Sequence, residues 1–379
     1  MKENRSLLII SFMSGFPWGG SEELWFKTAT HALLEGKEVK ILIKKWSNDH
    51  ENINILRSKG AQIFYLGEKN PEQKGFIQKI FTKKLKKRNI PFKDLILDGV
   101  DKILVSQGDT FSTFGNTLFQ ELLKLDKSVY LISEHLSDTG IPSTEIRKIA
   151  RNSLNRIEKF FFVSNRSLEL TKRYLNSSGD NFLLVNNPVN LKDKKIVEYP
   201  KNKTLNFGVV ARLDCKFKGQ DILLEVLSQE KWKKRDWSCN LYGSGVDHQY
   251  LDDLISTYGL NDKVVIRGHI KSVKGIWRKN HILVLSSISE GTPLSLIEAQ
   301  ICGRVAIGTD VGGVSEVIHD NINGWIAQAP LKSYLDDAME RAWNERDKWE
   351  QMGKVAHDMV MKRYEEDAGE QLFNIIFSR

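Results

Sequence analysis

Short apolar runs alternate along the chain with longer segments in which apolar residues recur every three or four positions. An apolar run of four to eight residues is typical of a buried strand, and the longer spacing is typical of a helix with one buried face. This alternation indicates βαβ units on a parallel sheet. In the first half, the predicted strands are 7–13, 38–43, 62–66, 102–106, 128–133, 160–163 and 182–185, and the predicted helices are 21–35, 50–58, 76–87, 113–125, 144–157 and 166–176.

The alternation breaks at residues 186–203, which are rich in charge, contain two prolines and are typical of a linker. It then restarts, and from residue 330 the pattern is helical to the end. The second series predicts strands at 204–211, 238–242, 263–266, 282–286, 304–308 and 325–327, and helices at 219–228, 247–257, 271–279, 293–302 and 313–319.

A chain of 379 residues is long enough for two domains. We predict an α/β protein of two Rossmann-like, doubly wound domains that face a central cleft. In such sheets ligands bind beyond the carboxyl ends of the strands, so the loops after the strands matter most. The predicted parts are an N-terminal domain (1–190), a linker (191–203), a C-terminal domain (204–357) and a last helix (358–379) that packs back on the N-terminal domain.

Composition places the chain among ordinary soluble proteins, with 41% apolar and 27% charged residues. Its three cysteines are far apart and form no Cys-x-x-Cys pair, which argues against a disulfide framework or a zinc site and fits a reducing compartment. The apolar run at 7–13 is much shorter than the roughly 20 residues of a membrane span. We therefore expect a first strand there, no signal peptide, and a cytoplasmic location.

The net charge of +8 is concentrated in one segment. Residues 74–93 hold eight Lys and Arg and no acid, and their apolar residues recur at helical spacing. The pattern fits either a packed helix with a solvated basic side or a helix that docks on an anionic membrane, which would place the protein on the inner face of the membrane. A nucleic-acid partner is not expected, because no known module is present and the charge is confined to one segment.

The stretch "SISEGTPLSLIEAQICG" (287–303) leaves a predicted strand and enters a helix. Thr292 suits the N-cap of that helix and Pro293 its first position. The backbone N–H groups of Leu294 and Ser295 would then lack helical acceptors, and together with the helix dipole they would form a phosphate site.

Two carboxylates, Glu290 and Glu298, flank this start of a helix, with Gly291 between them. Either acid alone would more often be a solvated surface residue. Around a phosphate site, two separated carboxylates can accept hydrogen bonds from hydroxyls on either side of it. A sugar nucleotide has that layout, since its diphosphate lies between a sugar and a ribose.

At this motif the chain resembles the retaining glycosyltransferases of family 4, which have the GT-B fold and a Glu-x7-Glu signature. Other matching stretches are "GGSEE" (19–23), "FFVSN" (161–165), "NNPV" (186–189), "ARLDCKFKGQDILLE" (211–225), "LYGSG" (241–245), "VIRGHI" (265–270) and "GTDVGGVSEVIHDNINGW" (308–325). The resemblance covers nearly the whole length and is strongest over 204–326.

The resemblance implies a transfer reaction from a nucleoside diphosphate sugar to a glycan, glycolipid or glycoprotein acceptor in surface polysaccharide or lipopolysaccharide synthesis. Arg212 and Lys218 would face the leaving diphosphate, Glu290 the donor sugar, Glu298 the ribose, and His135 the transferred sugar. The implied donor-binding set also includes Gly19, Gly20, Gly243, His269, Gly291, Thr292, Pro293, Leu294 and Ser295. The residues expected to bind the acceptor are Trp18 and Asp138.

No metal and no other cofactor is expected, because the chain has no Asp-x-Asp pair and Arg212 and Lys218 can supply the positive charge. The acceptor hydroxyl would attack on the face that the diphosphate leaves, and a leaving phosphate oxygen can take its proton. The resemblance therefore implies that no side chain acts as a nucleophile.

Several of these residues also have an ordinary structural interpretation, and other functions stay open. The two glycines at 19–20 can form a simple turn, His135 can be a core histidine, and Trp18 can belong to the edge of the core. A GT-B epimerase or sugar-phosphate synthase is the alternative among enzymes, and a non-catalytic glycan-binding or membrane scaffold is the alternative outside them. A dinucleotide-dependent oxidoreductase is disfavoured, since no Gly-x-Gly-x-x-Gly occurs.

Overall fold

The computed structural model describes residues 6–13, 15, 17–66, 96–136 and 140–378. The predicted helix 76–87, the basic segment 74–93 and Asp138 lie outside the described residues. The chain forms two compact units: unit 1 consists of residues 1–188 and 366–379, and unit 2 of residues 189–365. The chain therefore passes between the units twice.

Unit 1 is built on a parallel seven-stranded sheet with the order β3-β2-β1-β4-β5-β6-β7. The order turns back at β1, the point at which a doubly wound sheet reverses direction. The strands are β1 (Ser6–Ser11), β2 (Glu38–Lys44), β3 (Gln62–Leu66), β4 (Lys102–Asp109), β5 (Ser128–His135), β6 (Lys159–Phe162) and β7 (Phe182–Leu184).

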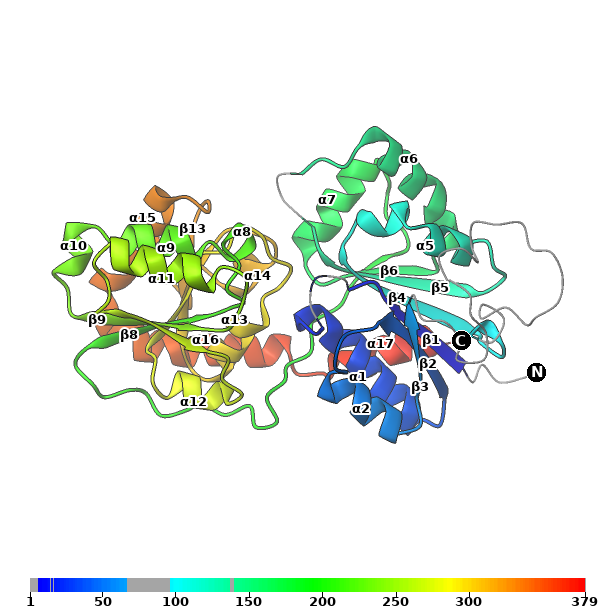
Figure 1. Cartoon of the computed structure of the whole chain (residues 1–379), viewed down its shortest axis with the longest axis horizontal. Coiled ribbons are helices and arrows are strands. Elements are labelled where there is room, and N and C mark those ends of the chain that lie inside the picture. Colours follow the sequence, from blue (N-terminus) through cyan, green and yellow to red (C-terminus); the bar gives the residue numbers. More distant parts are fainter. Residues whose placement is uncertain (1–5, 14, 16, 67–95, 137–139, 379) are drawn as a thin grey trace. The chain divides into compact units, whose positions relative to one another are not determined.

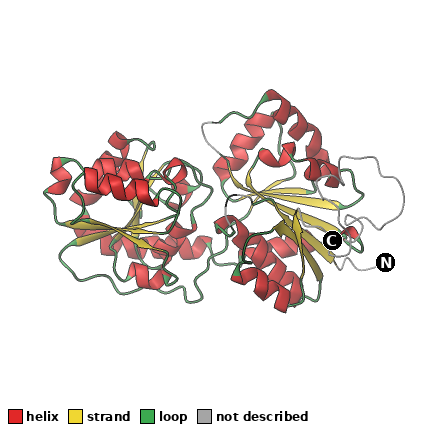
Figure 2. Ribbon diagram, in the orientation of Figure 1, coloured by secondary structure: helices red, strands yellow, loops and turns green. Residues whose placement is uncertain are grey.

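Helices cover both faces of this sheet (Figure 1 and Figure 2). Because side chains alternate along a strand, each strand contributes to two cores. One core packs under α1 (Gly20–Leu34), α2 (Glu51–Ser58) and α17 (Ala368–Phe377). The other packs under η1 (Ser112–Gly115), α5 (Thr117–Leu122), α6 (Thr144–Ser153) and α7 (Asn165–Leu175), with the short η2 (Leu154–Arg156) after α6.

The last helix, α17, belongs to unit 1 although it follows unit 2 in the chain. It packs on α1 so closely that a Cβ on Gly369 would lie 2.3 Å from the Cβ of Lys27. The hydroxyl of Tyr130 on β5 donates to the carbonyl of Ile376 at 3.2 Å. The return to unit 1 begins at residue 366; the predicted start at 358 falls inside α16 (Trp349–Arg363), which belongs to unit 2.

Unit 2 has a parallel six-stranded sheet with the order β10-β9-β8-β11-β12-β13. The strands are β8 (Leu205–Val210), β9 (Trp237–Tyr242), β10 (Val264–Gly268), β11 (Ile282–Leu285), β12 (Val305–Thr309) and β13 (Gly324–Ala327). The helices are α8 (Cys215–Lys218), α9 (Gln220–Leu227), α10 (Glu230–Lys233), α11 (His248–Thr257), α12 (Val273–Trp277), α13 (Leu294–Ile301), α14 (Val314–Val317), α15 (Lys332–Asn344), η3 (Arg346–Lys348) and α16.

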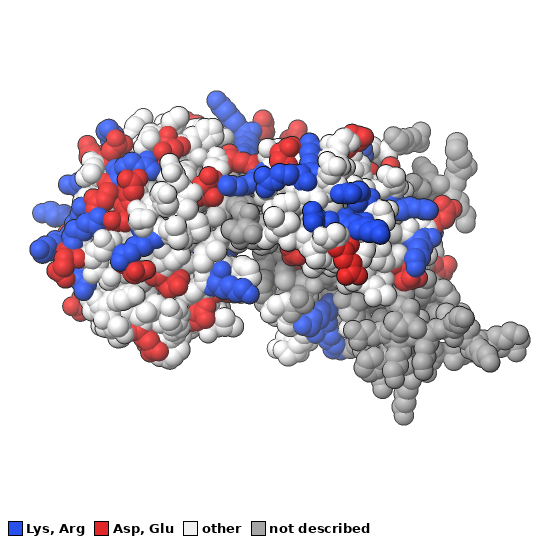
Figure 3. Space-filling model, turned by 90° about the horizontal axis from the view of Figure 1, so that it is seen from above, with Lys and Arg blue, Asp and Glu red and all other residues white. Residues whose placement is uncertain are grey.

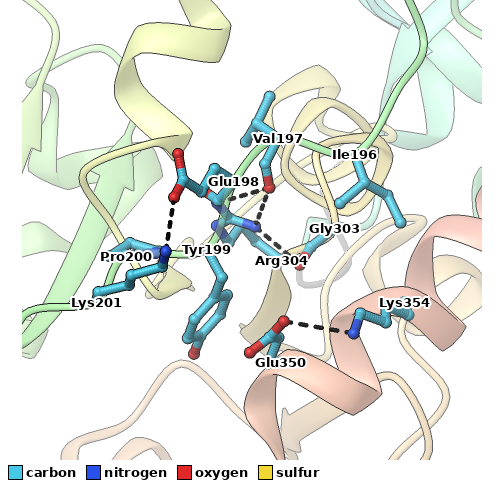
Figure 4. Close-up of a pocket in the computed structure, with 10 residues that line it drawn as sticks. All are labelled: Ile196, Val197, Glu198, Tyr199, Pro200, Lys201, Gly303, Arg304, Glu350 and Lys354. Atoms are coloured by element: carbon cyan, nitrogen blue, oxygen red, sulfur yellow. Dashed lines mark hydrogen bonds and ion pairs between the residues drawn. The ribbon is translucent and has the colours of Figure 1, made fainter.

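A fully buried arginine, Arg304, fastens the predicted linker to unit 2 (Figure 4). Its guanidinium donates to the carbonyls of Val197 and Glu198 on one side and of Trp277 and Asn280 on the other. Burial lowers the pKa of Arg304 to about 10. Residues 196–201 are therefore part of unit 2 and not a free connection. A pocket opens there, at the amino ends of the strands, lined by Ile196, Val197, Glu198, Tyr199, Pro200, Lys201, Gly303, Arg304, Glu350 and Lys354.

One predicted helix is interrupted in the structure, and another is preceded by a short helix that was not predicted. The prediction at 113–125 splits into η1 and α5, because the side chain of Asn116 caps a new helix by accepting from the N–H groups of Leu118 and Phe119. The helix predicted at 219–228 is confirmed as α9, and the single-turn α8 before it was not predicted. Gly219 between them has φ +56°, a left-handed conformation that ends one helix and starts the next.

Candidate functional site

The carboxyl edge of the unit 2 sheet gathers the residues predicted to bind the donor. All six strands are parallel, so the loops that follow them emerge at the same edge. Four neighbouring strands lead to the predicted residues: Arg212 and Lys218 follow β8, Gly243 follows β9, His269 follows β10, and Glu290 to Ser295 follow β11.

At the centre of this edge, Lys218 and Glu290 form an ion pair. The ammonium Nζ of Lys218 lies 2.7 Å from Oε1 of Glu290, and Oγ of Ser287 donates to the same oxygen at 2.7 Å. Glu290 is only 7% exposed, so its charge is matched inside the protein. The fold thus brings together two side chains that are 72 residues apart in the sequence.

The loop that carries the basic residues is held on the end of β11. The hydroxyl of Ser286 donates to the carbonyl of Lys218 at 3.0 Å, and the N–H groups of Ile288 and Ser289 donate to the carbonyl of Phe217. A Cβ on Gly219 would lie 2.2 Å from the carbonyl oxygen of Ser286. Only glycine therefore fits at this position, and the close approach places Lys218 beside Glu290.

Arg212, the second predicted cation, is half-exposed and pairs with a carboxylate of its own loop. Its Nη2 lies 2.9 Å from Oδ2 of Asp214. The side-chain amide of Gln220 donates to the carbonyl of Arg212 at 2.7 Å, which fixes the backbone at the end of β8. Arg212 therefore precedes the short helix α8 and Lys218 is its last residue, at the edge where Glu290 lies.

The loop after β12 packs on the backbone of Glu290. Gly312 has φ +52°, and a Cβ there would lie 2.1 Å from the carbonyl oxygen of Glu290. The N–H of Gly313 donates to the carbonyl of Gly291 at 2.6 Å. The two glycines of "DVGG" therefore allow this loop to pack directly on the backbone of Glu290 and Gly291.

Helix α13 begins one residue later than the sequence predicted. Pro293, not Thr292, is the N-cap, with the extended conformation φ −69°, ψ 122°, and Leu294 is the first helical residue. The carbonyl of Pro293 already accepts from the N–H of Leu296. The predicted start at Pro293 was one residue early, because the backbone of Pro293 is extended and not helical.

Three residues of α13 remain accessible at this edge. Leu294, Ser295 and Glu298 are half-buried, while Leu296, Ile297 and Ala299 are buried against the sheet. Glu298 lies three and four positions after Ser295 and Leu294, on the same side of the helix. This face is suited to a ligand with an anionic group at the helix start and hydroxyls one turn further.

Two predicted residues lie at the border of the site. Gly243 has φ +141°, and a Cβ there would lie 2.0 Å from the carbonyl oxygen of Ala211, so the packing of β9 on the loop after β8 already requires a glycine. Its N–H donates to the carbonyl of Gly268, which closes the edge toward β10. His269, the next residue, is exposed.

In unit 1, the predicted residues also lie at the carboxyl ends of strands. His135 is the last residue of β5 and half-exposed, and its carbonyl accepts from the N–H and the hydroxyl of Thr110. Gly19 is the N-cap of α1 and Gly20 its first residue, both with access to solvent. The role of Gly19 and Gly20 in binding the donor stays a prediction.

Trp18 is packed against its own unit. Its ring stacks on His50 with the centroids 4.5 Å apart, and its indole N–H donates to Oε1 of Glu23 at 2.6 Å. Trp25 and Phe26 contact it at the edge. These contacts fit the edge-of-core interpretation, and the acceptor role of Trp18 stays a prediction.

Two buried acids near this loop were not predicted as a pair. Glu22 is 4% exposed and accepts from the hydroxyl of Ser11 at 2.8 Å. Burial raises the pKa of Glu22 to about 7. Burial, reinforced by repulsion from Glu22, raises the pKa of Glu134 on β5 well above its usual range. The sequence signal was weak, because Glu22 looks like an ordinary acid in the first turn of a helix.

Sequence reasoning also missed Ser287, Asp214 and Gly219. The hydroxyl of Ser287 follows a buried strand and lies three residues before Glu290, a spacing that could have suggested the contact. Asp214 was overlooked because the cations of its loop dominate the pattern. Gly219 follows a lysine at the end of a short helix, which is a C-cap signal inside what the apolar spacing predicts as a helix start.

The described part of the chain contains no group of three or more His, Cys, Asp or Glu side chains arranged to hold a metal ion. Among the same residues, no helix is both long enough and apolar enough to cross a membrane. The three cysteines are free thiols and buried. The predictions on metal, compartment and location stay predictions.

Comparison with known proteins gives a family match over part of the chain and a fold for the whole. Residues 192–359 match the family "Glycosyl transferases group 1". The phosphatidylinositol N-acetylglucosaminyltransferase subunit from Arabidopsis thaliana is 27% identical over 59% of this chain, and the human protein of the same name is 23% identical over 86%. The matches span 51% and 65% of the length of these two relatives.

Among solved structures, the HepE protein of Anabaena in complex with UDP has a TM-score of 0.75 and 15% identity, over 99% of this chain and 100% of that one. The same protein in complex with UDP-glucose has a TM-score of 0.71 and 14% identity, over 98% of both chains. A likeness at this identity shows the fold. The predicted α/β fold of the GT-B type, with two doubly wound sheets, is confirmed.

Proposed function

Because residues 192–359 form a domain of the glycosyl transferases group 1 on a GT-B fold, we propose that the protein is a retaining, metal-independent glycosyltransferase that uses a nucleoside diphosphate sugar. The transferred group would be a hexosyl residue. Support for a uridine nucleotide comes from the HepE structures, which hold UDP and UDP-glucose. The observation that carries the proposal is the contact of Lys218 with Glu290 beside the start of α13.

Unit 2 offers each part of such a donor a matching group. We assign the diphosphate to Arg212, Lys218 and the first N–H groups of α13, because phosphate charge is stabilised by fixed cations and by a helix start. The donor sugar is assigned to Glu290, and the ribose hydroxyls to Glu298. Four further residues are proposed to lie next to the donor: Gly19, Gly20, Gly243 and His269.

In the proposed reaction, the bond from the anomeric carbon to the diphosphate oxygen breaks and a bond to the acceptor oxygen forms on the same face. The proton of the acceptor hydroxyl passes to the leaving phosphate oxygen. Negative charge grows on the diphosphate during this step, and Arg212 and Lys218 stabilise it. His135 in unit 1 is proposed to contact the transferred sugar. No side chain needs to act as a nucleophile.

The acceptor is proposed to be a glycan, glycolipid or glycoprotein of a surface polysaccharide pathway, held in part by unit 1. The names of the two relatives, which refer to phosphatidylinositol, favour a lipid-linked acceptor. This in turn supports the prediction of a protein at the inner face of the membrane. Trp18 and Asp138 are kept as proposed acceptor residues.

The test is a product analysis with uridine diphosphate sugars, with and without a pool of glycan and lipid acceptors, in the presence of a chelator. We expect a transferred sugar whose anomeric configuration equals that of the donor. Lys218→Ala and Glu290→Gln should reduce turnover at least a hundredfold, while Lys201→Ala, at the opposite edge of the sheet, should not. Conversion of the donor alone into an epimer, or transfer only to a sugar phosphate, would support the alternative enzymes. Full turnover in both site variants would refute the site.

A further inference from the structure

The two helical layers of unit 1 differ in charge. The helices of one layer, η1, α5, α6, η2 and α7, hold seven Lys and Arg and three Asp and Glu. The helices of the other layer, α1, α2 and α17, hold two Lys and Arg and four Asp and Glu. Figure 3 looks down on the side of α6 and α7 and shows Lys and Arg gathered on unit 1 there. This surface is called the α6–α7 face below.

The basic side chains of α6 share one side of the helix. Arg147 and Lys148 lie four and three positions before Arg151, so each is a neighbour of Arg151 on the helix surface. Ala150 and Ser153, on the other side, are buried. Lys148 and Arg151 are exposed.

Helix α7 and the turn after α6 extend the same surface. Arg166 and Arg173 are seven positions apart, two turns of one side of α7, and Arg173 is exposed. Arg156, in the turn between α6 and β6, is exposed as well. The side chain of Arg151 donates to the carbonyl of Leu175 at 2.8 Å, which ties the two helices together. The charges therefore lie on one rigid layer.

An exposed apolar residue borders this layer. Ile141, three residues before the start of α6, is 71% exposed and has the second-largest exposed fraction among the large apolar residues described. A basic face beside an accessible apolar side chain is a combination found in proteins that bind at the lipid headgroup level.

The distribution of groups favours a lipid surface over a nucleic acid. Proteins that bind single-stranded nucleic acid stack bases on exposed aromatic rings. All four aromatic residues of the stretch 144–176 are buried: Phe160, Phe161, Phe162 and Tyr174. Moreover, the basic side chains are spread along two helices and do not converge on one buried polar group. This arrangement suits an extended anionic surface.

We propose that the α6–α7 face docks the protein on an anionic lipid surface, with Ile141 at the headgroup level. The partner is a membrane leaflet rich in acidic phospholipid, and the attraction comes from Lys148, Arg151, Arg156 and Arg173. The benefit of this docking rests on the proposed function, since docking brings the donor-binding unit to a lipid-linked acceptor. The face is formed by described residues and includes none of the basic segment 74–93.

The experiment is sedimentation of the full chain with vesicles of phosphatidylcholine alone or with about 30% phosphatidylglycerol. The test variant is Lys148→Glu/Arg156→Glu/Arg173→Glu, which leaves the contact of Arg151 with Leu175 intact. The matched control is Lys234→Glu/Lys279→Glu/Lys362→Glu, with three exposed lysines of unit 2 and the same change of net charge. Thermal unfolding verifies that both variants are folded.

We expect the parent and the control to bind the anionic vesicles and to lose binding at high salt. Each basic residue near the surface contributes roughly a fivefold change in partitioning, so the test variant should bind about a hundredfold more weakly. Binding of the test variant equal to the parent overturns the proposal, and so does a parent that binds RNA of equal charge but not the vesicles. Donor turnover is measured separately with a soluble acceptor, and it should be unchanged in the test variant. If the parent and both variants all lack turnover, the proposed function is refuted but the docking is not.

Discussion

The ammonium of Lys218 lies 2.7 Å from Oε1 of Glu290, so the two loops that follow β8 and β11 are joined by an ion pair at the carboxyl edge of unit 2. The sequence motifs assign Lys218 to a diphosphate and Glu290 to a sugar. Their contact means that these two parts of one ligand would meet at a single point. It also means that each residue holds the other in place.

Removal of the cation should expose this dependence. Lys218→Met leaves the carboxylate of Glu290, which is 7% exposed, without its opposite charge, and we expect unit 2 to lose about 3 kcal/mol of unfolding free energy. Adding Glu290→Gln to this variant should restore part of the loss, since the amide carries no charge. Urea unfolding of the full chain, followed by tryptophan fluorescence, measures both effects. Equal stabilities of the single and the double variant would contradict the account.

Gly312 should be needed for the position of Glu290. In Gly312→Ala the new Cβ would lie 2.1 Å from the carbonyl oxygen of Glu290, in addition to the strain of a positive φ. The matched control is Gly259→Ala in the same unit, where φ is +62° and the nearest heavy atom is 4.0 Å away. The control should lose only about 1–2 kcal/mol. Gly312→Ala should lose clearly more and also reduce turnover, and similar losses in both would refute the close contact.

Stability should depend on pH through Glu22. Its pKa is raised by burial from 4.5 to about 7, so the folded state favours the protonated carboxyl. This contribution is complete below about pH 4.5 and is lost as the pH rises toward 7, so unfolding free energy should fall across that window. Glu22→Gln should reduce the fall, while Glu145→Gln, at an exposed position of α6, should leave it unchanged. An identical pH profile in Glu22→Gln and the parent would contradict the assignment.

Arg304 should be a structural residue of unit 2 rather than a ligand of the pocket beside it. Its guanidinium serves backbone carbonyls on both sides, so Arg304→Met would leave several buried oxygens without donors. We expect a loss of roughly 3 kcal/mol or more in urea unfolding. Arg304→Lys should recover little of it, because an ammonium cannot reach the same set of carbonyls. A stable Arg304→Met variant would show that the linker is held by other contacts.

Much of the fold could be predicted from the sequence because its strands are buried on both faces and therefore form continuous apolar runs, such as "LLII" in β1 and "ILVL" in β11. The parts that escaped prediction depend on single residues. Asn116 restarts a helix, Gly219 separates the unpredicted α8 from α9, and the extended backbone of Pro293 starts α13 one residue late. None of these leaves a periodic signal.

The candidate site shows the same division. The motifs placed Arg212, Lys218, Glu290 and α13 at one edge of one sheet, since loops after parallel strands meet there. Contacts that join different loops could not be derived from local pattern, as with Ser287 on Glu290 and Gly312 behind it. The coupling of Glu22 with Glu134 likewise arises only when α1 is packed on the sheet that contains β5.

UDP titration followed by calorimetry measures whether the carboxyl edge of unit 2 binds the diphosphate of the donor. The parent and Lys201→Ala, altered in the pocket at the amino ends of the strands, should bind UDP with equal affinity. Arg212→Ala should bind at least tenfold more weakly, because a cation facing the diphosphate is lost. Equal affinity of Arg212→Ala and the parent, or a selective loss in Lys201→Ala, would contradict the account.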